Sequence, residues 1–275
     1  SNILIVYSLA SGGVSIAALF LAGYMPGILV GFMLMLVAGV IAKRKDYPVG
    51  KFEGFGYVLK TFWDALPSLF LLVLVIGGIV AGYFTATEAS AIAVLYTFLL
   101  SFVFYREAGY GELPQILLDS VKTTAVVMLL IGTSMSLSWV MSYSNIPQSV
   151  SEALLSISSN DIIILLIINI LLLMVGTFMD MTPAVLIFTP IFLPVVTAMG
   201  IDPIHFGIIM VLNLCVGLTT PPVGTVLFVG CGVADISITR IVKPLMPFFA
   251  AMVIALIIVT AWPALSLWLP GIFGF

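Results

Sequence analysis

The sequence predicts an all-α polytopic membrane protein, and two observations carry that prediction. Hydrophobic residues make up 62% of the 275 residues, charged residues make up 8%, and the mean hydropathy is +1.31. A soluble domain is about 45–50% apolar and about 25% charged, so folding cannot hide this excess from water. Apolar runs of about 18 residues recur along the chain, which is typical of membrane-spanning helices.

The apolar runs give the expected elements in order. They cover residues 2–22, 26–42, 67–82, 85–105, 122–143, 161–200, 204–230 and 245–269. The nine basic residues all fall at the ends of these segments: Lys43, Arg44, Lys45, Lys51, Lys60, Arg106, Lys122, Arg240 and Lys243. The positive-inside rule places those ends in the cytoplasm. Nine scattered basic residues give nucleic-acid binding no support.

Segment 161–200 is expected to be a re-entrant hairpin. Residues 144–160 carry one acid and no base, as an outer loop should, and 204–230 must return inward to reach Arg240. The intervening segment therefore enters and leaves on the outer side. Its tip is marked by Gly176–Pro183, which leaves two arms of about 15 residues, or about 22 Å each, short of the ~30 Å hydrocarbon core.

Two stretches have the pattern of helices that lie flat on the cytoplasmic surface. Residues 51–66 place their apolar side chains on one helical face, and 112–121 are a weaker version of the same pattern. An ordinary amphipathic linker is the alternative for both.

Segment 204–230 is expected to be broken. It contains Thr219-Thr220-Pro221-Pro222 between two glycines, and proline removes an N–H and clashes with the preceding turn. Irregular backbone at membrane depth is tolerated inside protein or along a water-filled cavity, so a break of this kind suggests a site for a small hard cation such as Na⁺. A proline kink satisfied by neighbouring helices is the alternative.

The hairpin tip supplies the second half of the candidate site. Asp180 is the one charged residue between Asp161 and Asp202, and an intramembrane carboxylate suggests function. Asp180 or Thr182 could equally cap the second arm, with Pro183 at its first helical position. A helix N-terminus here also favours an anionic substrate.

Other reactive side chains have structural interpretations. Thr87 is expected to cap a helix with Glu88 in its first turn, and His205 is expected at a helix start on the outer surface. Cys215 and Cys231 lie in apolar segments without metal-ligand spacing and are expected to be buried, unpaired thiols.

The two ends of the chain share a weak internal echo. Residues 223–247 resemble 1–26, with Ser15-Ile16 matching Ser237-Ile238 and Met25-Pro26 matching Met246-Pro247. The charge topology gives the two stretches opposite directions, as an inverted repeat would.

Four stretches together carry a resemblance to a known family. They are GGIVAGYFTATEASA, GTFMDMTPAVLIFTPIFLPV, GIDPIHFGIIMVLNLCVGLTTPPVGTVLFV and the opening SNILIVY with VSIAALFLAG. Over essentially all of its length, the chain resembles the C-terminal part of the large membrane subunit of TRAP (tripartite ATP-independent periplasmic) transporters.

The resemblance implies a Na⁺-coupled importer of an organic acid, of the sialic acid or C4-dicarboxylate type, in the bacterial inner membrane. It implies two partners, a small four-helix membrane subunit (separate or fused) and a periplasmic substrate-binding protein. The implied fold has inverted repeats that move as an elevator, with the second repeat complete and the first partial. An ion channel with a re-entrant hairpin is the alternative. The sequence contains no catalytic pair of the kind that an intramembrane enzyme needs.

The resemblance also assigns regions and residues. Residues 1–25 end the first-repeat core, 26–121 form a scaffold with arm helices, 122–242 form the second-repeat core, and 243–275 form a C-terminal transmembrane helix. The implied Na⁺ ligands are Gly176, Thr177, Asp180, Gly217, Thr220 and Val223, with Ser1 bordering the first-repeat ion site. The substrate-site candidates are Thr182, Pro183, Thr219, Pro221 and Pro222.

Overall fold

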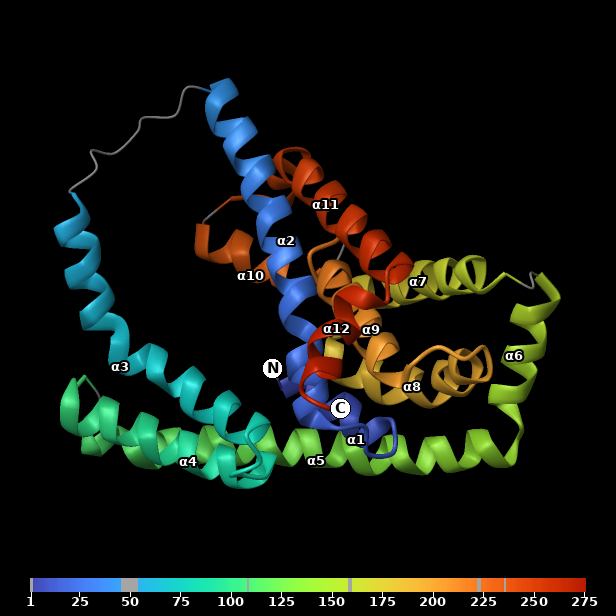
Figure 1. Ribbon diagram of the computed structural model, residues 1–275, viewed down its shortest axis with the longest axis horizontal. Coiled ribbons are helices and arrows are strands. Elements are labelled where there is room, and N and C mark those ends of the chain that lie inside the picture. The colour runs from blue at the N-terminus through green and yellow to red at the C-terminus, as the bar shows by residue number, and fades with distance from the viewer. Residues whose placement is uncertain (1, 46–53, 108, 158–159, 222–223, 235) are drawn as a thin grey trace. The chain divides into compact units, whose positions relative to one another are not determined.

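The computed structural model describes residues 2–45, 54–107, 109–157, 160–221, 224–234 and 236–275. Within these ranges the regular structure is helical throughout (Figure 1). The elements are α1 (Asn2–Ala10), α2 (Ile16–Lys45), α3 (Phe55–Val80), α4 (Ala86–Phe98), η1 (Leu99–Phe104), η2 (Tyr110–Glu112), α5 (Leu113–Tyr143), α6 (Ile146–Ile157), α7 (Asp161–Phe178), α8 (Met181–Ala198), α9 (Pro203–Leu218), α10 (Thr225–Ala234), α11 (Ile238–Ala261) and α12 (Ala264–Ile272).

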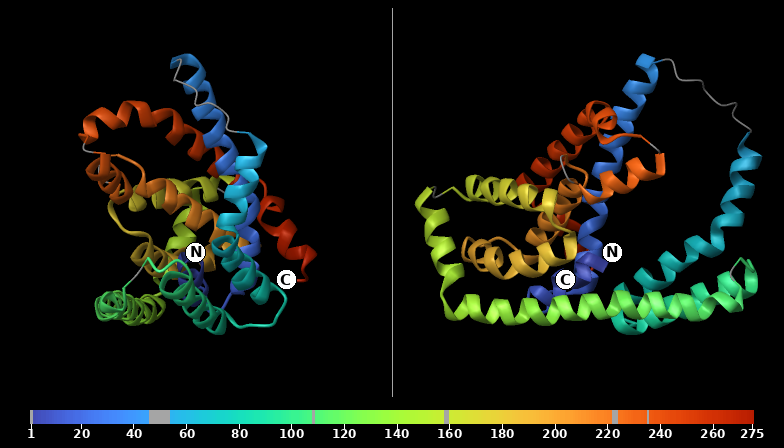
Figure 2. Two further views of the ribbon diagram at one scale, coloured as in Figure 1. Left: turned by 90° about the vertical axis from the view of Figure 1, so that its left-hand side faces the viewer. Right: turned by 180° about the vertical axis from the view of Figure 1, so that it is seen from behind.

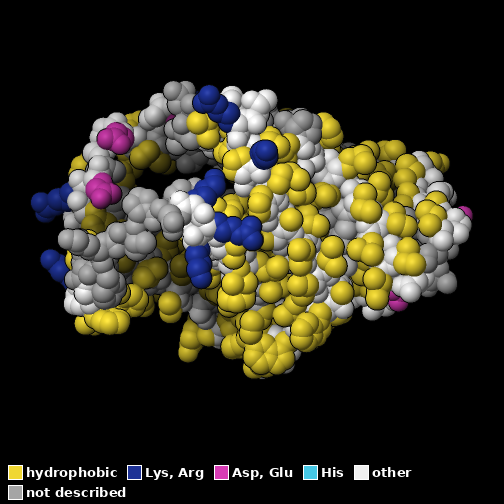
Figure 3. All heavy atoms as spheres, turned by 90° about the horizontal axis from the view of Figure 1, so that it is seen from above, with side chains coloured by type: hydrophobic (Ala, Val, Ile, Leu, Met, Phe, Trp, Pro, Cys, Tyr) yellow, Lys and Arg dark blue, Asp and Glu magenta, His cyan; other side chains and the backbone are white. Residues whose placement is uncertain are grey.

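Seven of the helical segments in the described ranges are long and apolar enough to cross a membrane. Hydrophobic side chains also cover much of the face drawn in Figure 3, among separate groups of charged side chains. An apolar exterior of this extent suits lipid rather than water. The prediction of an all-α polytopic membrane protein is therefore confirmed.

The chain divides into two compact units, Ser1–Lys45 with Val127–Phe275, and Asp46–Val126. In the larger unit α9 is the central helix, since α1, α2, α7, α8, α11 and α12 all pack against it. Its side chains Phe206, Ile209, Met210 and Leu214 are almost completely buried. The core of this unit lies around α9, between the two arms of the expected hairpin and the C-terminal helices.

The expected hairpin is present as α7 and α8, which pack against each other and lie side by side (Figures 1 and 2). Each arm has 18 residues, or about 27 Å at 1.5 Å per residue, and is longer than expected. The arms are longer because most of the expected tip is helical: α7 continues to Phe178 and α8 begins at Met181.

The predicted end of the first apolar segment is wrong. The sequence predicts one segment over 2–22, but α1 ends at Ala10 and α2 runs through Pro26 to Lys45. Gly12 and Gly13 have φ of +84° and +108°, which favours glycine and stops the first helix. Pro26 is tolerated because a membrane helix can satisfy the freed carbonyl through its neighbours.

The internal echo has a structural counterpart. Ser15 directly precedes α2 and its hydroxyl accepts a bond from the N–H of Ala18, while Ser237 is the N-cap of α11. In both places a short helix of nine or ten residues precedes a long helix with a proline inside it. The alignment of Ser15-Ile16 with Ser237-Ile238 therefore matches two helix starts.

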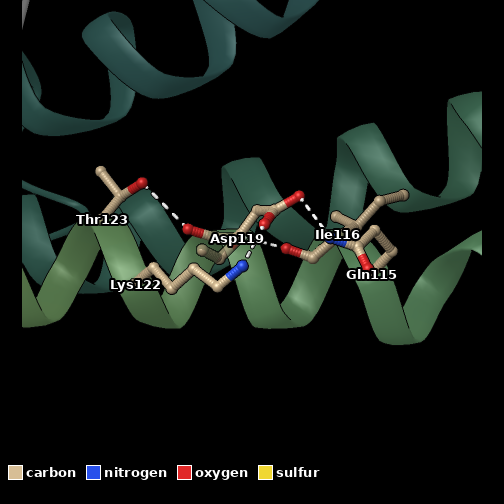
Figure 4. Close-up of polar contacts among 6 residues, drawn as sticks. Gln115, Ile116, Asp119, Lys122 and Thr123 are labelled. Carbon is tan, nitrogen blue, oxygen red and sulfur yellow. Dashed lines mark hydrogen bonds and ion pairs between the residues drawn. The ribbon is translucent and has the colours of Figure 1, made fainter.

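In the smaller unit, the two expected surface helices do not exist as separate elements. Residues 55–66 continue through Pro67 into the apolar part of α3, and residues 113–121 continue into α5. At this proline the Tyr96 hydroxyl of α4 donates a 2.7 Å hydrogen bond to the Pro67 carbonyl, which links α4 to α3. Residues 51–53 lie outside the described ranges. Asp119 bonds to Gln115 and Lys122 on the exposed surface of α5 (Figure 4).

Two further boundaries differ from expectation. The expected outer loop 144–160 contains α6, an amphipathic helix that packs against α8. The expected single C-terminal helix is two helices, because the chain turns at Trp262 and Pro263 between α11 and α12.

Candidate functional site

The hairpin tip is a two-residue extended link between α7 and α8. Met179 and Asp180 have ψ of 148° and 158°, and the N–H of Met179 still bonds to the carbonyl of Val175. Asp180 occupies the N-cap position of α8, but its carboxylate makes no capping bond and is exposed. Pro183 is the third residue of α8, not the first as expected. The start of α8 therefore keeps N–H groups and partial positive charge near the tip.

The break in segment 204–230 is present between α9 and α10. α9 ends at Leu218, Thr219 caps it, and α10 begins at Thr225. Gly224 has a φ of +28°, and a Cβ there would lie 2.7 Å from the Leu218 carbonyl oxygen and 2.9 Å from that of Thr220. The chain thus folds back until two carbonyl oxygens surround Gly224, a position that only glycine fits.

The tip and the break come together at two glycines. A Cβ added to Gly217 would lie 2.8 Å from both the Cα and the carbonyl carbon of Gly176. Thr177, next to Gly176, is 7% exposed. The structure therefore brings the end of the first hairpin arm against the end of α9, and both helices stop within one or two residues of that contact.

The threonine hydroxyls at this contact donate their protons to their own helices. Thr219 and Thr220 donate to the Val216 carbonyl at 2.8 and 2.7 Å, and Thr177 donates to the Leu173 carbonyl at 2.9 Å. Each hydroxyl oxygen keeps lone pairs as an acceptor. Hydroxyl and carbonyl oxygens are the ligands that hard cations prefer. The described residues hold no cluster of three or more His, Cys, Asp or Glu, so the candidate ligands for a small cation are mostly neutral oxygens.

A buried amide pair holds α7 against α9. The side-chain nitrogen of Asn213 donates to both the backbone and side-chain oxygens of Asn169, each at 2.8 Å. Asn169 in turn donates to the Thr260 hydroxyl at 2.9 Å, and that hydroxyl donates to the Leu256 carbonyl of α11. All three polar side chains are at least 94% buried. The sequence analysis did not identify this series of hydrogen bonds. An asparagine inside an apolar segment is nevertheless the same kind of signal that drew attention to Asp180.

The structure describes most, but not all, of the predicted site residues. Gly176 and Gly217 are in contact, and Thr177 and Thr220 lie in the adjoining helix ends. Thr182, Pro183, Thr219 and Pro221 flank the two breaks and are partly buried. Ser1, Pro222 and Val223 lie outside the described residues.

Three expectations about other reactive groups are corrected. The cap of α4 is Thr85, not Thr87: its hydroxyl accepts from the Glu88 N–H, and the Glu88 carboxylate accepts from the Thr85 N–H at 2.8 Å. His205 lies in the first turn of a helix as expected but is 1% exposed, and it shares a pocket with residues of α7, α11 and α12. Cys231 is buried as expected, whereas Cys215 is exposed on α9; both thiols are free.

Comparison with known proteins shows which family this chain resembles. Residues 1–265 match the family model described as tripartite ATP-independent periplasmic transporter, DctM component. The chain is 56% identical over its whole length to an uncharacterized protein, YgiK, of Salmonella typhimurium, and covers 63% of that protein. It is 38% identical to the C4-dicarboxylate TRAP transporter large permease protein DctM of Pseudomonas aeruginosa, with 100% of the chain and 64% of the relative covered.

A third relative is the sialic acid TRAP transporter large permease protein SiaM of Vibrio cholerae, which is 37% identical, with 98% of the chain and 63% of the relative covered. The chain therefore spans less than two thirds of the length of these relatives.

Proposed function

Because the chain belongs to the DctM component family of tripartite ATP-independent periplasmic transporters, we propose that it is the permease part of a Na⁺-coupled importer of an organic acid. One observation supports this proposal most directly. The hairpin tip and the end of α9 meet at Gly176 and Gly217, and each helix stops beside that contact. Helices broken at one depth are how transporters assemble an ion site from backbone carbonyls.

The proposed ion site uses the oxygens at this contact. At the end of α9 the Gly217 carbonyl accepts the Thr220 N–H at 2.9 Å and keeps a second lone pair, and Thr177 and Thr220 add hydroxyl lone pairs. Gly176, Gly217 and Val223 would contribute through their carbonyls, and Asp180 through its carboxylate. Na⁺ is a hard cation that such a set of oxygens suits.

The proposed substrate is a small organic anion. Two of the relatives carry the names of C4-dicarboxylate and sialic acid transporters, and both substrates are carboxylates. A carboxylate would be attracted by the bound cation and by the N-terminal end of α8, which carries partial positive charge. Thr182 and Pro183 lie in the first turn of α8, and Thr219 and Pro221 lie at the break. Pro222, the other proposed substrate-site residue, follows Pro221 in the sequence.

The proposed mechanism is an elevator movement of the hairpin and α9 as one body. The tight contact of α7 with α9 and the buried Asn169–Asn213 pair favour such a body, because separating it would expose unpaired amides. The proposed partners are a small four-helix membrane subunit and a periplasmic binding protein, and the proposed location is the bacterial inner membrane.

Uptake measurements test the proposal. The whole permease, including any segment that precedes this chain naturally, is reconstituted in proteoliposomes with the small subunit and binding protein encoded beside it. Labelled sialic acid or a C4-dicarboxylate should accumulate when an inward Na⁺ gradient is imposed and should not accumulate when K⁺ replaces Na⁺. If uptake did not depend on the Na⁺ gradient, the assignment of a Na⁺ site would be wrong. If single-channel currents were recorded, the protein would be a pore and not a carrier.

A further inference from the structure

A polar cavity of about 340 Å³ lies in the smaller unit between α3 and the end of α4. Four hydroxyl side chains and one carboxylate line it together with two leucines: Ser68, Thr97, Ser101, Tyr105 and Glu107. A polar lining of this kind is unusual between membrane helices, where exposed polar groups are costly. Nothing in the proposed ion site involves these residues.

The cavity is built by an irregular helix end. η1 is a π-helix, a rare form that is frequent at functional sites. After it, Arg106 has a φ of +55°, and the N–H of Glu107 bonds back to the Ser101 carbonyl at 3.1 Å. A regular helix would carry Glu107 onward, away from Ser101. The π-helix and the left-handed residue bring the carboxylate back beside the hydroxyls.

The lining is rich in acceptors. Thr97 donates its hydroxyl proton to the Ala93 carbonyl at 2.6 Å, and the Tyr105 hydroxyl lies 3.5 Å from the Asp64 carbonyl and 3.4 Å from the Ser68 hydroxyl. These hydroxyls therefore keep mainly lone pairs for a further partner. The Glu107 carboxylate can only accept, and no ion pair of Glu107 occurs within the described ranges.

Such a lining suits a group that is positively charged and carries only donors. A primary ammonium group has three N–H donors and fits this description, whereas an anion would be repelled by Glu107. None of the described residues that line the cavity is basic.

The position of the cavity indicates where the ammonium group comes from. Arg106 follows the segment at the end that the positive-inside rule places in the cytoplasm, so the cavity lies at the membrane surface. Arg106 is exposed beside Glu107 and can pair with a phosphate. Apolar side chains of α3 and α4 are also exposed, among them Leu72 at 58% and Val94 at 68%, and can contact acyl chains.

We propose that this cavity binds the headgroup of an ethanolamine phospholipid, with the ammonium group on Glu107 and the hydroxyls, and the phosphate beside Arg106. The site is separate from the proposed transport site, so it stands whether or not the protein carries a substrate. Its basis is the juxtaposition of a carboxylate, four hydroxyls and an arginine at a π-helix end.

Native mass spectrometry of the purified, delipidated protein tests the site. The protein is titrated with phosphatidylethanolamine, phosphatidylcholine and phosphatidylglycerol of identical acyl chains. Phosphatidylethanolamine should be retained best, because the trimethylated choline group has no N–H donor and the glycerol group carries no positive charge. Glu107→Gln should lower its retention by about tenfold, the usual effect of losing one charge-assisted hydrogen bond.

Two variants serve as controls. Glu112→Gln removes an exposed acid of the same unit that does not line the cavity, and it should leave retention unchanged. Ser101→Ala should lower the retention of phosphatidylethanolamine by a smaller factor. It tests the same site independently if Glu107→Gln does not fold. Equal retention of the ethanolamine and choline lipids, or equal loss in both acid variants, would overturn the proposal. Displacement of the lipid by free ethanolamine alone would assign the cavity to a soluble amine instead.

Discussion

Gly217 of α9 lies against the backbone of Gly176 in α7, so closely that a Cβ on Gly217 would sit 2.8 Å from the Gly176 carbonyl carbon. The atoms in the way are backbone, which cannot swing aside as a flexible side chain can. The contact therefore needs glycine on α9 and fixes the distance between the two helices at the candidate site. It links the hairpin tip to the break through a direct contact of the two backbones.

Replacing Gly217 with alanine should push α7 and α9 apart. We expect a loss of about 1–3 kcal/mol in stability, the usual cost of overpacking, and a larger proportional loss of Na⁺-dependent uptake. The thermal unfolding midpoint in detergent and the uptake rate measure the two effects. Gly132→Ala is the matched control, since a Cβ on this helical glycine of α5 meets no atom within 4 Å. Equal behaviour of the two variants would show that the close contact has no consequence.

The Asn169–Asn213 pair should behave as one unit. Removing either amide leaves a buried donor or acceptor of its partner without a bond, which costs about 1–3 kcal/mol. The double variant Asn169→Ala with Asn213→Ala should therefore be less destabilised than the sum of the single variants, by about 0.5–3 kcal/mol. Unfolding of the four proteins under the same conditions gives the coupling energy. Strict additivity would mean that the two side chains do not support each other.

Tyr7 fixes the start of α9. Its hydroxyl donates to the Pro203 carbonyl at 2.6 Å, and its ring fills the space that a Cβ on Gly207 would enter at 2.4 Å. Tyr7→Phe should lower stability by about 1 kcal/mol, because the carbonyl loses its partner while the ring stays packed. Gly207→Ala should cost more, because the fully buried ring cannot move aside. Tyr24→Phe, on an exposed position of α2, is the control, and a cost as large as that of Tyr7→Phe would remove the argument.

The helix breaks were predictable from the sequence because they depend on local chemistry. Two adjacent prolines between glycines cannot continue a helix, and Met179-Asp180 precedes a proline in the next turn. The continuity of α2 and α3 through Pro26 and Pro67 was not predictable in the same way. It depends on how other helices pack around each proline, as α4 does where the Tyr96 hydroxyl donates to the Pro67 carbonyl.

The parts of the site that depend on long-range packing also escaped prediction. Asn169 and Asn213 are 44 residues apart, and their pairing follows from how α7 crosses α9. The exposure of Cys215 and the burial of His205 depend on which face of α9 is covered. Periodicity identifies an apolar helix, but in a membrane it does not show which side faces protein and which side faces lipid.

Thr220 offers the sharpest test of the ion proposal. Its hydroxyl donates to the Val216 carbonyl and keeps acceptor lone pairs, so Thr220→Val removes one oxygen while preserving the shape of the side chain. We expect the Na⁺ concentration for half-maximal uptake to rise by about tenfold, which corresponds to about 1.4 kcal/mol. Thr220→Ser, which keeps the hydroxyl, should remain close to the wild type.

Thr197→Val is the matched control for the loss of a threonine hydroxyl. Thr197 makes the same kind of bond to a carbonyl one turn back, at 2.8 Å to Leu193, but lies at the far end of α8 from the tip. Its variant should leave the Na⁺ dependence unchanged. If Thr220→Val lowered the maximal rate without altering the Na⁺ dependence, the hydroxyl would be supporting the break and not binding the ion, because a lost ligand changes affinity first.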